Sequence, residues 1–161
     1  MASSSPPVRR FAVCIRNRVA AVVLIVGDQV IRLWRRHFAY AAGRSRVEYL
    51  SELLSRLREQ HVVHEIVVEP DSDAHAAALS LGFVTYTVRL CDAKASLLGG
   101  TSGATTHREL VEYLVDTQSV LAAQLTRMRS GRIPVAPGQR WQTIIVLAAA
   151  LGLATQVTPS P

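Results

Sequence analysis

Lysine is almost absent from this sequence, which has Lys94 alone beside 17 arginines. The guanidinium group of arginine is planar and forked, so it binds phosphates and carboxylates through paired hydrogen bonds that lysine cannot make. The formal net charge at pH 7 is +6 over 161 residues. The composition therefore favours a ligand or partner with anionic groups, although GC-rich coding would give the same bias.

Cysteine is also scarce, since the chain has Cys14 and Cys91 alone. Two cysteines this far apart in sequence exclude a zinc ribbon and a disulfide-stabilised scaffold. Both lie in apolar, strand-like runs, so we expect buried thiols in a reducing compartment. The apolar segment 19–27 lacks a signal-peptide cleavage pattern, and the expected location is therefore the cytoplasm.

The sequence lacks an apolar run of about 20 residues, the length that a membrane-spanning helix needs. The run 144–154 is shorter and predicts a packing helix rather than a membrane anchor. Charged residues make up 19% of the chain and hydrophobic residues 49%, a balance that excludes an intrinsically disordered protein. We expect one globular domain and no membrane partner.

The positive charge is concentrated near the N-terminus. Residues 1–46 contain nine arginines and one acidic residue, Asp28, and a second basic cluster without an acid runs from Arg127 to Arg140. Segregated charge of this kind is typical of a surface that binds nucleic acid. A solvated, arginine-rich surface would give the same pattern.

The pattern of apolar residues predicts three strands and then alternating helices and strands. After a Ser/Pro leader that we expect to be disordered, the strands are 11–15, 19–26 and 30–40, and gaps this short predict antiparallel hairpins. A helix with Ser45 as its N-cap and Glu48 completing a capping box follows. The later elements are a strand at 63–69, a helix at 74–81 capped by Asp71 or Ser72, a strand at 83–90, and helices at 107–129 and 141–156.

This order predicts an α/β fold with a mixed five-stranded sheet flanked by helices. We divide the chain into a leader (1–8), an α/β domain (9–130), a linker (131–140) and a C-terminal helix (141–156). The order resembles that of the ribonuclease H-like superfamily, which includes ribonuclease H, retroviral integrases, transposases and RuvC-type Holliday-junction resolvases. The match to RuvC-type resolvases extends over about residues 11–127.

The resemblance implies where catalytic carboxylates would lie. Ribonuclease H-like nucleases hold two divalent cations with acids on the first strand, at the end of the fourth strand and on the last core helix. Glu69 matches the fourth-strand position. Asp116, in the helix expected at 107–129, matches the first of two aspartates on the last core helix, and Ser119 replaces the second.

The first strand departs from the resolvase pattern. Where resolvases carry an aspartate, this sequence reads Cys14-Ile15-Arg16-Asn17-Arg18. A guanidinium group cannot coordinate Mg²⁺, so we predict that Arg16 or Arg18 forms ion pairs with Glu69 and Asp116 in place of a metal site. Alternatively, both acids are ordinary helix-cap or surface carboxylates.

The third strand alternates cationic and aromatic side chains. The residues that share one face are Arg32, Trp34, Arg36, Phe38 and Tyr40. Such a face can hold phosphates and stack bases. Alternatively, the aromatic rings pack beneath a helix while the arginines extend into solvent.

A loop rich in Gly, Thr and Ser at 99–106 is a second candidate for phosphate contact. It leads into a predicted helix and is flanked by Lys94 and Arg108, an arrangement that can bind an anion at a helix N-terminus. An ordinary connecting loop explains the same residues.

These observations favour a non-catalytic accessory protein that binds nucleic acid, DNA in preference to RNA, in recombination or mobile-element DNA processing. No catalytic residue is expected, and Glu69 and Asp116 are vestigial candidates. No cofactor is expected either. The predicted nucleic-acid contacts are Arg16, Arg18, Arg32, Trp34, Arg36, Lys94 and Arg108.

Two other functions remain open from the sequence. One is a Mg²⁺-dependent, structure-specific nuclease that uses Glu69, Asp116 and Glu112 as a reduced set of ligands. The other is a protein-interaction module in which the helices at 107–129 and 141–156 form a homodimer or partner interface.

Overall fold

The computed structural model describes residues 7–16, 18–38, 45–99, 107–122 and 140–157. The strands are β1 (Arg9–Arg16), β2 (Val19–Val26), β3 (Gln29–His37), β4 (Glu65–Val68) and β5 (Val84–Thr87). The helices are α1 (Arg46–His61), α2 (Asp73–Ser80), α3 (Leu90–Leu98), α4 (His107–Thr117) and α6 (Arg140–Val157).

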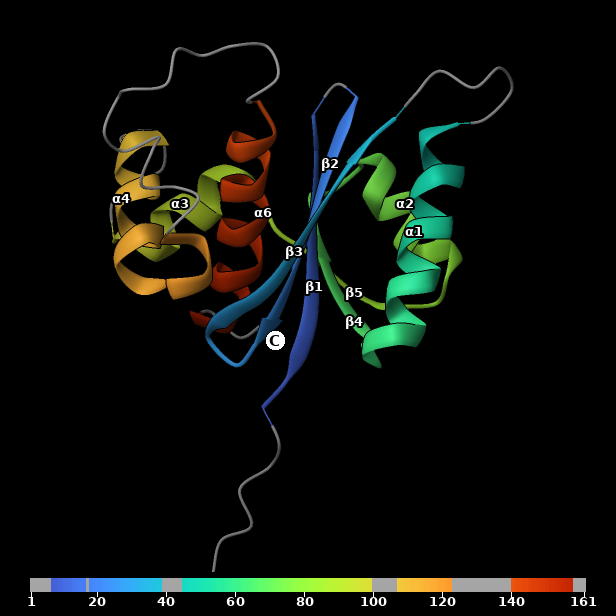
Figure 1. Ribbon diagram of the computed structural model, residues 1–161, viewed down its shortest axis with the longest axis horizontal. Coiled ribbons are helices and arrows are strands. Elements are labelled where there is room, and N and C mark those ends of the chain that lie inside the picture. Colours follow the sequence, from blue (N-terminus) through green and yellow to red (C-terminus); the bar gives the residue numbers. More distant parts are fainter. Residues whose placement is uncertain (1–6, 17, 39–44, 100–106, 123–139, 158–161) are drawn as a thin grey trace, which may run out of the picture.

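The five strands form one mixed sheet in the order β3-β2-β1-β4-β5. β1, β2 and β3 pair as antiparallel hairpins, whereas β4 runs parallel to both β1 and β5. Helices α1 and α2 cover one face of the sheet, and α3, α4 and α6 cover the other (Figure 1). The predicted α/β fold with a mixed five-stranded sheet is therefore confirmed.

Both faces of β2 are buried, which explains why this strand is apolar along its whole length. Along β1, Phe11 and Val13 pack toward α1 and α2, while Ala12 and Cys14 pack toward α6. This alternation follows from the two-residue period of a strand. A small residue at Ala12 lets a helix approach the centre of the sheet closely.

The predicted helix caps agree with the structure at α1 and α2. The Ser45 hydroxyl accepts a hydrogen bond from the backbone N–H of Glu48, and the Ser72 hydroxyl accepts one from that of His75. Each bond satisfies an N–H group that has no partner within its own helix. Ser72 is therefore the cap of α2, and Asp71 lies outside the helix with a φ of 57°.

The sequence analysis missed helix α3 and extended the preceding strand too far. The segment expected as a strand at 83–90 forms β5 over four residues, and α3 begins at Leu90. Its N-cap, Arg89, makes no capping bond through its side chain, so the usual signal for a helix start is missing. Cys91 consequently lies exposed in the first turn of α3, and the expectation that both thiols are buried is wrong for this one.

The helix expected at 107–129 is interrupted. α4 ends at Thr117, and residues 119–122 start a new helical segment. The side chain between them, Gln118, is 3% exposed and binds the β2–β3 turn: its Oε1 accepts from the backbone N–H of Val30, and its Nε2 donates to the carbonyl of Asp28. Residues 123–129 lie outside the described part of the chain.

Helix α6 lies across the central strands of the sheet (Figure 1). Its residues 144–154 are all buried, and they pack against β1, β2 and α3. α4 instead packs against α6 and α3 as an outer layer (Figure 1). A helix that is apolar all round suits the inner position, while the amphipathic α4 suits the outer one.

The predicted packing helix at 144–154 is thus confirmed. Within the described residues, none of the helices combines the length and the hydropathy required to cross a membrane.

Candidate functional site

Arg16 and Glu69 form an ion pair where β1 ends beside the end of β4. The Arg16 Nη1 atom lies 2.6 Å from Glu69 Oε1, and Nη2 lies 3.1 Å from Oε2. A two-bond pair of this kind fixes the plane of both groups. The side chains are 41% and 22% exposed, and the hydrogen bonds to Glu69 raise the pKa of Arg16 above its ordinary value. The predicted pairing of Arg16 with Glu69 is therefore confirmed.

The buried thiol of Cys14 also contacts Glu69. Its Sγ atom lies 3.4 Å from Glu69 Oε1, and the residue is 1% exposed. Burial raises the pKa of the thiol from 9.0 to about 12, and the nearby Glu69 carboxylate also raises it. Cys14 is thus a neutral donor to Glu69 at physiological pH.

This environment predicts that Cys14 does not react with thiol reagents at pH 8 in the folded protein, because the thiolate is the reactive form. A colorimetric thiol assay should find one reactive thiol, the exposed Cys91, and two after unfolding. The pKa of Cys14 in the folded protein lies above 9.0, the ordinary value for a cysteine thiol. The stabilisation from the neutral thiol is therefore complete below pH 9 and is lost as the pH rises toward 12. Rapid labelling of native Cys91→Ser protein would contradict this prediction.

Asp116 lies away from Glu69. It is exposed on α4, two residues before Gln118, whose side chain binds the β2–β3 turn. Glu69 follows β4 at the opposite end of the sheet, where β1 meets β2. The expected convergence of these two acids is therefore wrong. Among the described residues, no three His, Cys, Asp or Glu side chains are grouped so as to hold a metal ion.

The cationic and aromatic row on β3 faces the α1 side of the sheet. Arg32, Trp34 and Arg36 pair with Leu24, Val22 and Ala20, which pack toward α1. Arg32 and Arg36 are exposed. Arg35, which pairs with Ala21, faces the α6 side instead.

The aromatic members of this row pack beneath α1, as the alternative interpretation held. The Trp34 ring is half-buried, with its centroid 6.1 Å from that of Phe11 and 5.1 Å from that of His61. Phe38 is 8% exposed and lies 5.8 Å from the Tyr49 ring. Tyr40 lies outside the described residues.

Positive charge surrounds the outer part of Trp34. The Arg32 guanidinium lies 5.5 Å from the ring centroid, a cation–π distance. Desolvation, together with the nearby charges of Arg32 and Arg9, lowers the pKa of His61 below its ordinary value. The lowered pKa favours the neutral form of His61 beside these two cations.

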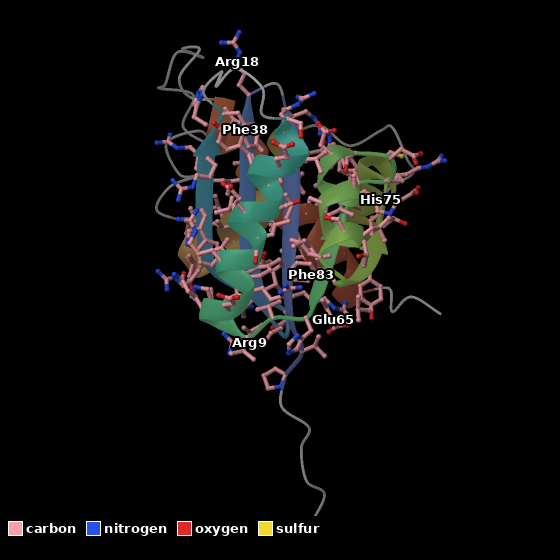
Figure 2. The ribbon with its side chains drawn as sticks, turned by 90° about the vertical axis from the view of Figure 1, so that its right-hand side faces the viewer. Arg9, Arg18, Phe38, Glu65, His75 and Phe83 are labelled. Carbon is pink, nitrogen blue, oxygen red and sulfur yellow. The ribbon has the colours of Figure 1, made fainter. Side chains whose placement is uncertain are left out.

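The remaining predicted contacts are divided between the two sides of the sheet. Arg18 is exposed at the β1–β2 turn, and its carbonyl accepts a 2.7 Å hydrogen bond from the N–H of Phe38. Figure 2, which faces α1, shows Arg18 and Phe38 at one end of the molecule and Arg9 at the other. Lys94 is half-buried on α3, in the helix layer that covers the other face of the sheet (Figure 1). The side chain of Arg108 and the loop 100–106 lie outside the described part.

The sequence analysis missed Tyr49 and Arg56 on α1, which lie beside the end of β3 and line a pocket there with Arg36 and Phe38. The sequence nevertheless contains a pattern that could have identified these two residues. Residues seven apart lie on one side of a helix, and the buried residues Leu50, Leu53 and Leu57 already orient α1. Tyr49 and Arg56 flank that buried stripe, so the helical spacing places them together at its edge.

No known protein-family profile matches the chain, and no curated protein matches it in sequence. Among solved structures, the chain is similar to RuvC from Thermus thermophilus, with a TM-score of 0.58. The match covers 92% of this chain and 93% of that chain, at 11% sequence identity. The chain has a RuvC-like, ribonuclease H-like fold.

Proposed function

We propose that this protein binds nucleic acid without cleaving it, DNA in preference to RNA, as an accessory factor in recombination or mobile-element DNA processing. The observation that carries the proposal is the Arg16–Glu69 ion pair. Glu69 occupies the fourth-strand position at which the resemblance to resolvases implies a metal ligand. Arg16, at the end of β1, stands where the aspartate would be.

The donor atoms around Glu69 support a non-catalytic role. Both carboxylate oxygens already accept hydrogen bonds from Arg16, and Cys14 donates to one of them. A divalent cation needs several oxygen ligands and would lie against a fixed positive charge here. The residues at this position do not fit such an ion, and we derive no reaction step through one.

Helix α6 supports the same conclusion. It is the helix that crosses the sheet, and its N-terminus lies at the end where β1 meets β2 (Figure 1). The sequence from Arg140 to Val157 contains no aspartate or glutamate. α6 therefore brings no carboxylate to the end of the sheet where Glu69 lies, and Asp116, the acid matched to the last core helix, lies away from it.

The surface proposed to bind the nucleic acid is the α1-facing side of β3 with the adjacent β1–β2 turn. It presents the exposed arginines Arg18, Arg32 and Arg36. Nitrogen-tipped side chains project along this edge of the sheet in Figure 2. Guanidinium groups spaced along a strand can contact successive phosphates.

Two measurements on the full chain test this function. We expect salt-sensitive binding to single-stranded and branched DNA by fluorescence anisotropy, and no cleavage of either when Mg²⁺ or Mn²⁺ is added. Cleavage that disappears in Glu69→Gln would establish the nuclease alternative instead. Absence of binding to any nucleic acid at low salt would show that the arginines serve another purpose.

A further inference from the structure

A pocket of about 280 Å³ lies where β3 ends against α1. Pockets that hold drug-sized molecules have volumes from about 300 Å³ upward. This pocket is slightly smaller, which is enough space for a ligand group the size of one planar ring system. It is lined by three consecutive residues of the β3 end and by four residues of α1, namely Arg36, His37, Phe38, Tyr49, Glu52, Leu53 and Arg56.

The inner part of the pocket is apolar and fixed in place. Phe38 is 8% exposed and Leu53 is 4% exposed. The Phe38 and Tyr49 rings lie 5.8 Å apart at an interplanar angle of 58°. The backbone N–H of Phe38 donates to the carbonyl of Arg18, which ties the aromatic wall to the β1–β2 turn.

The rim of the pocket is charged. Arg36 extends from β3, Glu52 and Arg56 lie four residues apart on α1, and all three are exposed. Two cations favour a phosphate. With the single carboxylate of Glu52, these three side chains leave the rim with a net positive charge.

These features together fit a nucleotide better than other anions. Inorganic phosphate would leave the aromatic wall unused, and an acidic side chain of a peptide would bring no flat ring to it. A nucleotide supplies a flat ring for the Tyr49 side of the wall and a phosphate for Arg36 and Arg56.

We propose that this pocket binds one unstacked nucleotide of a DNA strand, with its base against Tyr49 and its phosphate between Arg36 and Arg56. The inference rests on the proposed nucleic-acid-binding function and adds recognition of an unpaired base. The sheet register aligns Arg16 with Val19 and Val19 with His37, so the pocket lies about two strand spacings, roughly 10 Å, from Arg16. Arg18 adjoins the pocket, because its carbonyl accepts the hydrogen bond from the N–H of Phe38. Phosphates that flank the bound nucleotide can therefore reach Arg18.

The test uses the full chain and two DNA duplexes that carry the fluorescent base 2-aminopurine, one with this base unpaired and one with it paired. We expect the duplex with the unpaired base to bind about 10-fold more tightly, with its fluorescence quenched by stacking on Tyr49. Tyr49→Ala should remove both the preference and the quenching while leaving affinity for the paired duplex within about 2-fold. Tyr49→Phe, which keeps the ring, should retain them.

Tyr113→Ala is the matched control, because Tyr113 lies on α4 in the other helix layer. It should leave the preference and the quenching unchanged. If the two duplexes bind equally and Tyr49→Ala changes nothing, the pocket assignment is wrong while the proposed function stands. If neither duplex binds at low salt, the proposed function itself fails.

A free nucleotide would bring the same base and phosphate groups to the pocket as a DNA strand does. The monophosphate of 2-aminopurine riboside should show no quenching at concentrations that saturate the oligonucleotide. Quenching of the free compound at those concentrations would overturn the assignment to a DNA strand.

Discussion

Replacing both Arg32 and Arg36 with alanine is expected to weaken binding to single-stranded DNA by about 10- to 100-fold at low salt. Each guanidinium group is exposed on the α1-facing side of β3, and the net contribution of one hydrogen bond is about 0.5–1.5 kcal/mol, so two lost contacts cost about 1–3 kcal/mol. Two lost phosphate contacts should also make the plot of log affinity against log salt shallower by roughly 1.4, since each contact on a single strand accounts for about 0.7. Anisotropy titrations over a salt series measure both quantities.

Arg35→Ala provides the matched control for this prediction. It removes the same charge from the same strand, but Arg35 pairs with Ala21 and faces the α6 side. We expect the single Arg35→Ala variant to change the affinity by less than Arg36→Ala alone. Equal losses would mean that net charge governs binding, and that the α1-facing side is not the interface.

The Arg16–Glu69 pair was predictable because both residues follow apolar strands that the topology makes neighbours. Parallel strands bring their carboxyl ends to the same edge of a sheet, and β1 and β4 are adjacent in this order. The two-residue period of each strand then places both side chains at that edge. The apolar pattern of the sequence supplies the strand positions, whereas the resemblance to resolvases implied that the ends of the first and fourth strands lie together.

The position of Asp116 could not be predicted in the same way. The sequence predicts both the 107–129 and 141–156 segments as helices, and helical periodicity does not say which one crosses the sheet. The decision depends on packing: Gly152 and the alanines of α6 let this helix approach Ala12 of β1 closely, which the larger side chains of α4 would not allow. A comparison of residue volumes along the two helices would have favoured α6.

The aromatic residues of β3 show a second limit. Alternation on a strand establishes that Trp34 and Phe38 share a face, but not whether a helix covers it. The α1 residues Tyr49 and His61 cover these rings from opposite ends of one helix. The row on β3 therefore contains both exposed arginines and packed rings. Only the contacts with α1 show which of these side chains are covered.

The close approach of α6 to the sheet makes Gly152→Val the second substitution with a large expected effect. A Cβ atom at Gly152 would lie 2.8 Å from the Cβ of Ala12 and would overlap the Cδ1 of Ile25. Overpacking a well-packed core costs about 1–3 kcal/mol, and valine adds two further methyl groups. We expect a loss of about 3 kcal/mol in the free energy of unfolding, which lowers the melting temperature by roughly 6–12 °C in a chain of this size.

Gly152→Ala and Ile25→Val together test the cause of that loss. In an open helix, alanine is more stable than glycine by about 1 kcal/mol, so a destabilising Gly152→Ala would already indicate steric overlap. Ile25→Val removes the overlapping Cδ1 atom and should reduce the cost of Gly152→Ala by about 1 kcal/mol in a double-mutant cycle. Additive effects would contradict the contact with Ile25, because two substitutions that share no overlap do not influence each other. The contact with Ala12 remains in the double variant, so the rescue should be partial, and complete rescue would place the limiting overlap at Ile25 alone.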